Sequence, residues 1–399
     1  MNASQNFDPT DTTLEQVRRR ENLARSVLET IRDDNISQPR QGPTFTPAQA
    51  ADLVHRSTSA IRTAELEGRL PEQKRNAQNR RENYTLEQLD KMREVFGTRP
   101  WRHPSDEPLI IPVQNFKGGV GKTTLSVHLA QYFAIHGYRT LLIDVDAQAS
   151  ATMMFGYIPD LDIDIDQTAL PSLLKGDEEV YSPLKDSIRK THYHNLDLVP
   201  ANLHLYNAEY MLASRMAKLD AEESGKVLTA LRDEVNEVAQ GYDVVILDPP
   251  PALGMLSMSA LLAANALLVP MPPNTIDFSS TASFFSMLRQ NMEDMESRGV
   301  GVDYRFIQIA LTRTDENKWA QQQVVDMARE LFGGVVMPTE IKTSAEFDNS
   351  SSSHQSVYDL TRPTTNHQVR KRCLKQLNDL GAEVEALVRS VWPNTPAID

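Results

Sequence analysis

Two lysines, three glycines and two threonines lie close together in the segment 116–124, which reads Phe-Lys-Gly-Gly-Val-Gly-Lys-Thr-Thr. The segment follows the apolar run 109–113 and precedes apolar residues at helical spacing, so it is predicted to join a buried strand to a helix. Glycines let the backbone approach an anion, and a helix N-terminus offers it free N–H groups and a positive dipole end. Lys122 can then reach the β- and γ-phosphates of a nucleotide, and the Thr123 hydroxyl can bind Mg²⁺.

The segment departs from the ordinary phosphate-loop pattern G-x-x-x-x-G-K-[ST], because Phe116 stands in place of the first glycine and Lys117 follows it. The resulting K-G-G-V-G-K-T-T resembles the deviant-Walker ATPases, the family that includes ParA, Soj, MinD and the nitrogenase iron protein. The resemblance implies a homodimer that sandwiches ATP, with Lys117 crossing to the partner's phosphates, where a cation stabilises the transferring phosphoryl group. A solvated lysine is the alternative. The expected nucleotide contacts are Lys117, Gly118, Gly119, Val120, Gly121, Lys122, Thr123 and Thr124.

Acidic residues stand at the carboxyl ends of two further apolar runs. Asp144 ends the run 140–144 and Asp146 follows two residues later, and Asp248 ends the run 243–248. Ligands of parallel sheets bind at such ends, and Mg²⁺ prefers oxygen ligands and keeps waters. By the resemblance, Thr123 binds the metal, Asp144 and Asp248 support it through water, and Asp146 orients the attacking water. Aspartates in structural turns are the alternative.

The same resemblance implies two nucleotide-sensing switches. The first switch is 144–148, where Ala147 replaces the proline that most relatives carry. This replacement leaves the rigidity of the switch undecided, but it does not change the chemistry expected of the switch. The second switch is 249–254, Pro-Pro-Pro-Ala-Leu-Gly. The segment 271–278 also resembles the plasmid ParA group, without a contact that can be assigned to it.

The elements that must position these residues alternate between strand-like and helical. Near-continuous apolar strands between helices are typical of a parallel sheet covered on both faces. We therefore expect residues 106–399 to form an α/β P-loop NTPase domain with a mostly parallel sheet and helices on both faces. The predicted strands are 109–115, 140–144, 196–200, 243–248, 266–270, 305–311 and 335–337.

A second organised stretch, 43–105, precedes this domain. Thr46 and Pro47 open a helix, a short turn leads to a second helix that ends at Gly68, and a third begins at Tyr84. The order resembles the winged helix-turn-helix of MerR-type regulators and the N-terminal extension of larger ParA and RepA proteins. A three-helix protein-interaction domain is the alternative. The expected DNA contacts are Ser57, Thr58, Ser59 and Arg62 on the second helix and Arg75, Arg80 and Arg81 on the wing.

Residues 1–42 are predicted to hold a helix over 14–34 and a linker. The apolar stripe of this helix is thin, so it needs a partner to bury it. Dimerisation through this arm is the preferred interpretation, and packing on its own domain is the alternative.

Composition limits the possible functions of the chain. The net charge of −13 argues against indiscriminate polyanion binding, whereas residues 43–105 carry 11 basic and 8 acidic side chains. One cysteine, Cys373, excludes disulfides and the cluster of a nitrogenase-type reductase, and fits a reducing cytoplasm. No apolar run reaches the length of a membrane span.

Members of the family bind DNA without sequence preference in the ATP state, and by this resemblance such contacts are expected at Arg313 and Lys318. The basic cluster 370–375 is equally well explained as a solvated helix face.

Three functions follow from these features. The first is a DNA-partition ATPase of the cytoplasm and nucleoid that binds operator and nonspecific DNA, represses its own operator and works with a ParB/RepB-type centromere-binding protein. The second is a positioning ATPase of the MinD sort, which would need a basic amphipathic membrane anchor. The helix expected near the C-terminus has a core-like apolar stripe and a Pro-rich tail instead. The third is a transcription regulator in which the nucleotide serves only as a switch.

Overall fold

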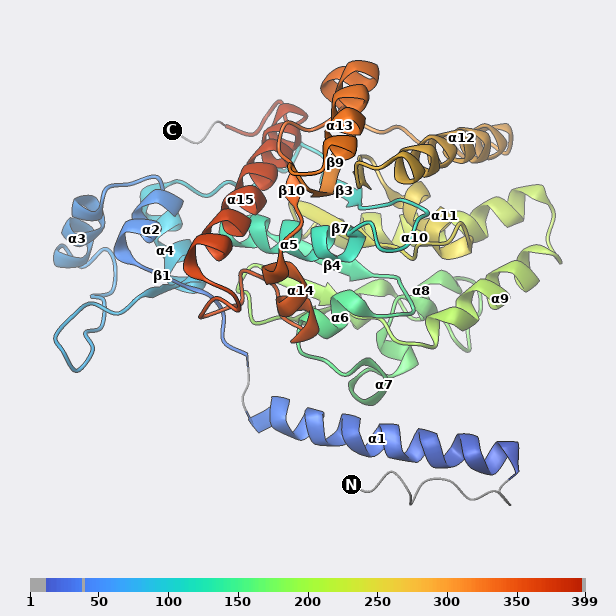
Figure 1. Cartoon of the computed structure of the whole chain (residues 1–399), viewed down its shortest axis with the longest axis horizontal. Coiled ribbons are helices and arrows are strands. Elements are labelled where there is room, and N and C mark those ends of the chain that lie inside the picture. Colours follow the sequence, from blue (N-terminus) through green and yellow to red (C-terminus); the bar gives the residue numbers. More distant parts are fainter. Residues whose placement is uncertain (1–11, 38–39, 397–399) are drawn as a thin grey trace.

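The structure is a computed structural model that describes residues 12–37 and 40–396 (Figure 1). Its centre is a sheet made of β3 (Leu109–Pro112), β4 (Thr140–Asp144), β5 (Arg189–Lys190), β6 (Leu196–Val199), β7 (Val244–Asp248), β8 (Leu267–Met271), β9 (Ile307–Thr314) and β10 (Ile341–Lys342). One part has the order β5-β6-β4-β7-β3 and the other the order β8-β9-β10. A bridge between Val113 and Leu268 joins the two parts. β5 is antiparallel to β6, and the other strand pairs described for this sheet are parallel.

Helices cover both faces of this sheet, which explains why its central strands are mostly apolar. Leu141, Leu142 and Ile143 of β4, for example, are fully buried. One face packs against α5 (Lys122–Ile135) and α15 (His367–Ser390). The other packs against α8 (Leu170–Leu173), α9 (Leu205–Met216), α10 (Ala221–Ala239) and α11 (Met255–Ala263). β8 and β9 pack against α12 (Thr275–Ser297) and α13 (Trp319–Phe332). Shorter helices are α6 (Ser150–Met154), α7 (Pro159–Asp162) and α14 (Ala345–Ser352).

The α/β fold with a mostly parallel sheet is therefore confirmed, with one wrong strand. The predicted strand 140–144 coincides with β4, and each of the other predicted runs up to 305–311 overlaps a strand whose ends differ by at most three residues. The run 335–337 supplies only a bridge between Val336 and Ile309, and the edge strand is β10 instead. β5 was not predicted either. Strands of two residues are too short to show a period in the sequence.

Residues 44–96 form a helical unit beside α5 and α15 (Figure 1). Its elements are β1 (Thr44–Phe45), α2 (Pro47–Leu53), α3 (Thr58–Leu66), β2 (Tyr84–Thr85) and α4 (Leu86–Phe96). Thr46 and Gln49 form a capping box at the start of α2, and Ser57 caps α3. Arg75 and Arg81 pair across a hairpin, and β1 pairs with β2. The apolar side chains of this unit belong to the same buried cluster as those of α5, so the two parts share one core.

The N-terminal helix α1 (Thr13–Ser37) contains the predicted 14–34 span and lies apart from the sheet (Figure 1). Arg32 forms an ion pair with Asp162 of α7, with 2.7 Å between Nε and Oδ1. The apolar stripe of α1 remains between 37 % and 59 % exposed, at Leu14, Val17, Leu23, Val27, Leu28 and Ile31. The alternative in which this stripe packs on its own domain is therefore wrong.

The long helix α15 is a core element. Leu377, Leu380, Val384 and Val388 are at most 4 % exposed. Among residues 12–37 and 40–396, no helix is long and apolar enough to cross a membrane. The apolar stripe of α15 is thus explained by packing on α5 rather than by a membrane surface.

Candidate nucleotide site and basic surface

The phosphate-loop segment lies between β3 and α5, as its sequence predicts. Gly119 and Gly121 adopt positive φ angles of +75° and +93°, and α5 begins at Lys122 directly after them. Such angles cost glycine little, and they aim the first N–H groups of the helix out of the turn. Lys122 is 6 % exposed, and its Nζ donates to the Lys117 carbonyl at 3.3 Å. Burial lowers the pKa of Lys122, and the charges of Asp248 and Asp146 oppose this shift.

Asp248 ends β7 next to the first turn of α5. Its Oδ1 accepts a hydrogen bond of 2.9 Å from Ser126 Oγ. Its Oδ2 is buried and has no hydrogen-bond partner among the described residues. Burial raises the pKa of Asp248 to about 6, while the nearby hydroxyl groups of Thr123 and Ser126 act in the opposite direction. A buried carboxylate oxygen without a partner next to a threonine hydroxyl fits water-mediated support of a cation.

Asp144 pairs in register with Asp248 on the neighbouring strand, so both carboxylates stand at the same level of the sheet. Asp144 Oδ2 accepts the Thr152 N–H at 2.9 Å and the Thr152 hydroxyl at 2.7 Å, and these bonds fix α6. Burial raises the pKa of Asp144 well above its usual value, and the neighbouring Asp248 adds to the shift. Asp144 thus anchors α6 as well as facing the site. The sequence did not reveal this structural role.

The first switch is held by local bonds and by α9. Asp146 accepts the Gln148 N–H at 2.9 Å, and Gln148 Nε2 donates to the Tyr206 hydroxyl at 2.8 Å. The carboxylate of Glu209, one turn further along α9, accepts the N–H groups of Met255 at 2.7 Å and Leu256 at 3.2 Å. These N–H groups begin α11, directly after the second switch. Tyr206 and Glu209 were not singled out in the sequence, because nothing local marks their contacts.

Lys117 is paired within its own chain. Its ammonium group forms an ion pair with Asp277 in the first turn of α12. The Lys117 N–H donates to Asn115 Oδ1 at 3.2 Å, and Asn115 Nδ2 donates to Thr281 Oγ1 at 3.2 Å. The loop is therefore tied to α12 at two points. The segment 271–278, which the sequence left without a contact, carries one of them.

Two hollows flank the loop. One lies between the loop and α12 and is lined by Lys117–Val120, Asn274, Asp277, Arg313 and Lys318. The other is partly open to solvent and is lined by Gly121, Thr124, Leu125, Ile341, Thr343 and Phe347, among others. Its mixture of apolar side chains and a few polar groups is typical of small-molecule sites.

Arg313 and Lys318, which were expected to contact DNA, lie at the loop. Arg313 has a φ of +55°, and its Nη1 donates to the Gly119 carbonyl at 2.9 Å. Lys318 Nζ lies 3.6 Å from the Asp315 carboxylate. In the cluster 370–375, Arg370 donates to the Leu360 carbonyl and Lys375 pairs with Asp379. Arg313 thus lies against the backbone of the phosphate loop.

A basic hollow lies between α3 and the 75–81 hairpin. Its lining residues are Pro47, Thr58, Ser59, Ile61, Arg62, Arg75, Arg81 and Tyr84. Ser57, Thr58, Ser59, Arg62, Arg75 and Arg80 are exposed. Arg81 instead turns inward, where it pairs with the buried Glu65 and donates to the Tyr84 hydroxyl at 3.0 Å. The structure thus brings five of the predicted residues, Thr58, Ser59, Arg62, Arg75 and Arg81, to one hollow, whereas Ser57 and Arg80 do not line it.

Comparison with known proteins agrees with this geometry. A family model described as an AAA domain matches residues 109–297. The chain is 35 % identical over 322 residues to SopA of Escherichia coli K12, covering 78 % of this chain and 79 % of SopA. A solved structure titled Partition Protein superimposes with a TM-score of 0.65 at 20 % identity, over 93 % of this chain and 98 % of that one. MinD of Pyrococcus horikoshii, solved with Mg-ADP, gives a TM-score of 0.50 at 18 % identity, over 71 % and 98 %.

The fold and the site define a P-loop ATPase of the ParA/MinD class. Within that class, the chain belongs to the ParA-type partition ATPases, the family of SopA.

Proposed function

We propose that the chain is an ATPase that segregates DNA and that binds ATP with Mg²⁺ between two subunits. The observation that carries this proposal is the unpartnered Oδ2 of Asp248, buried beside the first turn of the phosphate-loop helix. An acidic group kept there without a protein partner fits a site that is completed by a hydrated cation. Thr123 would hold Mg²⁺ directly, and Asp144 and Asp248 would hold it through water.

Each residue of the loop then has a defined task. The N–H groups of 118–124 would cradle the phosphates, and the Lys122 ammonium would leave the Lys117 carbonyl to bind the β- and γ-phosphates. Bound Mg²⁺ supplies positive charge at the phosphate oxygens. Asp146 would orient the attacking water. Lys117 would leave Asp277 and reach the partner subunit's phosphates. The base would occupy the hollow lined by Leu125, Thr343 and Phe347.

The basic hollow supports a second activity, operator binding by a winged helix-turn-helix domain at 43–105. α3 would enter the major groove with Ser57, Thr58, Ser59 and Arg62 at bases or phosphates, and the hairpin would contact the backbone through Arg75 and Arg80. Binding at its own promoter would repress the gene. The ATP-bound dimer would also bind nonspecific DNA, which would place it on the nucleoid in the cytoplasm.

Two partners complete the proposal. The exposed apolar stripe of α1 would pair with a second copy, so 1–42 would serve as a dimerisation arm. A centromere-binding protein of the ParB/RepB type would stimulate hydrolysis.

The deciding experiment is a gel shift with upstream DNA and random DNA, each in the presence of ADP and of ATP, together with a measurement of ATP turnover. We expect upstream preference with ADP, binding to both DNAs with ATP, and turnover that DNA and the partner stimulate. Turnover that stays at zero with both would favour the nucleotide-switched regulator. No DNA binding under any nucleotide would overturn the assignment of 43–105.

A further inference from the structure

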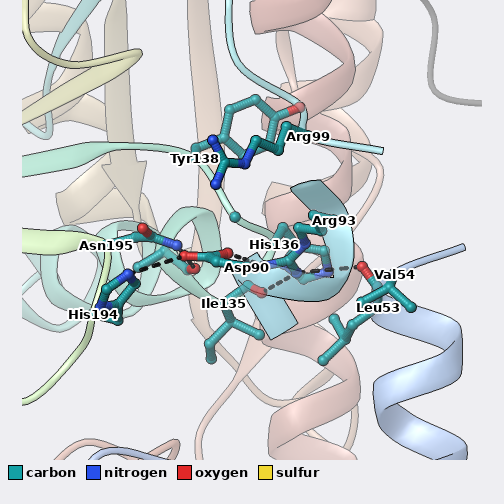
Figure 2. Close-up of polar contacts among 12 residues, drawn as sticks. Leu53, Val54, Asp90, Arg93, Arg99, Ile135, His136, Tyr138, His194 and Asn195 are labelled. Atoms are coloured by element: carbon teal, nitrogen blue, oxygen red, sulfur yellow. Dashed lines mark hydrogen bonds and ion pairs between the residues drawn. The ribbon is translucent and has the colours of Figure 1, made fainter. Parts of the chain in front are cut away.

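The junction between the 44–96 unit and the nucleotide-binding part is organised around one buried guanidinium (Figure 2). Arg93 of α4 is 1 % exposed. Its Nη1 donates to Asp90 Oδ1 at 2.7 Å, and its Nη2 donates to the carbonyls of Leu53 at 3.2 Å and Ile135 at 2.7 Å. Leu53 is the last residue of α2, and Ile135 is the last residue of α5. One side chain therefore binds the C-terminal ends of two helices that belong to different parts of the chain.

The neighbouring backbone leaves space for this guanidinium. Gly137, two residues after α5, has a φ of +92°, and a Cβ at that position would lie 2.7 Å from Arg93 Cζ. Glycine is thus required both for the turn and for the close approach. Burying a cation is costly unless its donors are satisfied, and burial lowers the pKa of Arg93 while Asp90 opposes the shift. Three polar oxygens satisfy it here.

Further contacts leave little freedom at this junction. The Trp101 indole N–H donates to the Gly137 carbonyl at 3.0 Å, and the guanidinium groups of Arg99 and Arg139 lie 4.3 and 4.5 Å from the Trp101 ring. Asp90 Oδ2 lies 3.6 Å from His194 Nε2, on the far side of Arg93 from α2. The segment 99–108, which connects α4 to β3, is therefore docked against the chain rather than a free linker.

We propose that Arg93 is the positioning residue that couples the nucleotide site to the DNA-binding surface. α5 begins at the phosphate loop and runs for 14 residues, about 21 Å, to the carbonyl that Arg93 binds. The same guanidinium binds the end of α2, five residues before α3 begins. A movement of α5 on nucleotide binding therefore shifts α2 and α3 with it. This coupling rests on the proposed function, since it presumes a nucleotide at the loop and DNA at α3.

The first test needs no DNA. Amide hydrogen exchange of α2 and α3 is measured in the full chain with no nucleotide, with ADP and with ATP. We expect nucleotide to change exchange there by about fivefold in the wild type, the lower end of usual coupling, and by less than about twofold in Arg93→Met. Arg99→Met is the matched control, because Arg99 lies in the same junction without touching α5; it should keep the wild-type response. An unchanged response in Arg93→Met, or none in the wild type, overturns the proposal.

The second test uses linkage. If upstream DNA binds, nucleotide and DNA must alter each other's affinity by the same factor, and Arg93→Met should reduce both factors toward one while ATP affinity without DNA stays within about twofold. If nucleotide changes the hydrogen exchange of α2 and α3 but no DNA binds, the coupling role of Arg93 stands and only the proposed DNA binding is overturned. If Arg93→Met fails to fold, Arg93→Lys is measured in its place. Lysine keeps the positive charge but lacks the planar guanidinium group that binds two carbonyls at once. Full coupling in that variant would refute the role of the guanidinium.

Discussion

The ammonium group of Lys117 lies on the carboxylate of Asp277 in the same chain, although 160 residues separate them. Asp277 is 5 % exposed, so this pair is partly shielded from water. A lysine that must act on a partner's phosphates first has to leave this carboxylate. Under the proposed function, the ion pair would therefore oppose dimer formation until nucleotide is bound.

Asp277→Asn should weaken this restraint while keeping the shape of the side chain. We expect the dissociation constant of the ATP-bound dimer to fall by about two- to fivefold, as measured by analytical ultracentrifugation with a non-hydrolysable analogue. Asp315→Asn, which alters an exposed pair with Lys318 beside the same loop, is the control and should change little. An unaltered dimer constant in Asp277→Asn would show that the ion pair is not a restraint.

The two lysines of the loop should separate binding from hydrolysis. Lys122→Ala removes the cation at the start of α5 and is expected to abolish ATP binding in calorimetry. Lys117→Ala should bind ATP within a few-fold of the wild type and lose turnover by a factor of about 100 or more. Normal hydrolysis by Lys117→Ala would contradict the action of this lysine across the dimer.

The raised pKa of Asp248 predicts a pH dependence of stability. Between its usual value of 3.8 and the folded value of about 6, the folded chain binds more protons than the unfolded chain. The free energy of unfolding without nucleotide should therefore fall as pH rises through this range, with Asp144 contributing in the same direction. Asp248→Asn should remove on the order of 3 kcal/mol of this fall in urea titrations, whereas Asp52→Asn, an exposed control, should leave the curve unchanged. A curve with the opposite slope would rule out the buried carboxylate as its cause.

Glu209 is expected to matter although it touches no phosphate. Its carboxylate caps α11 behind the second switch, so Glu209→Ala should lower the free energy of unfolding by about 0.5–2 kcal/mol and reduce ATP turnover. Glu209→Gln, which keeps one acceptor oxygen, should recover part of both. The exposed Glu223→Gln is the control for a change of charge alone. Full turnover in Glu209→Ala would exclude any role for the cap in hydrolysis.

Arg62 tests the DNA surface separately from the nucleotide site. It is exposed on α3 and lines the basic hollow. Arg62→Ala should weaken upstream-DNA binding by about 10-fold, corresponding to about 1–3 kcal/mol for a base contact, and leave ATP turnover intact. Arg69→Ala, outside the hollow, is the matched control. Equal losses on upstream and random DNA would reduce Arg62 to a phosphate contact.

The features that could be predicted from the sequence are those that depend on residues close together along the chain. Gly119, Gly121 and Lys122 reveal the loop because a strand, a glycine turn and a helix follow one another along the chain. Asp248 could be placed because it ends an apolar strand. The contacts of Lys117 with Asp277 and of Glu209 with α11 join segments far apart in sequence, so no window of residues contains them. Arg313 was assigned to DNA by its charge, whereas its positive φ and its bond to the loop depend on the packing of β9.

The shared core around Arg93 and Gly137 also affects how the chain can be divided. A fragment that starts at residue 106 would lack the side chains that the 44–96 unit adds to the buried cluster shared with α5, and would leave the Ile135 carbonyl without the Arg93 donor. Poor solubility or inactivity of such a truncated chain would reflect this disruption of the hydrophobic core. It would say nothing about whether the missing residues take part in hydrolysis.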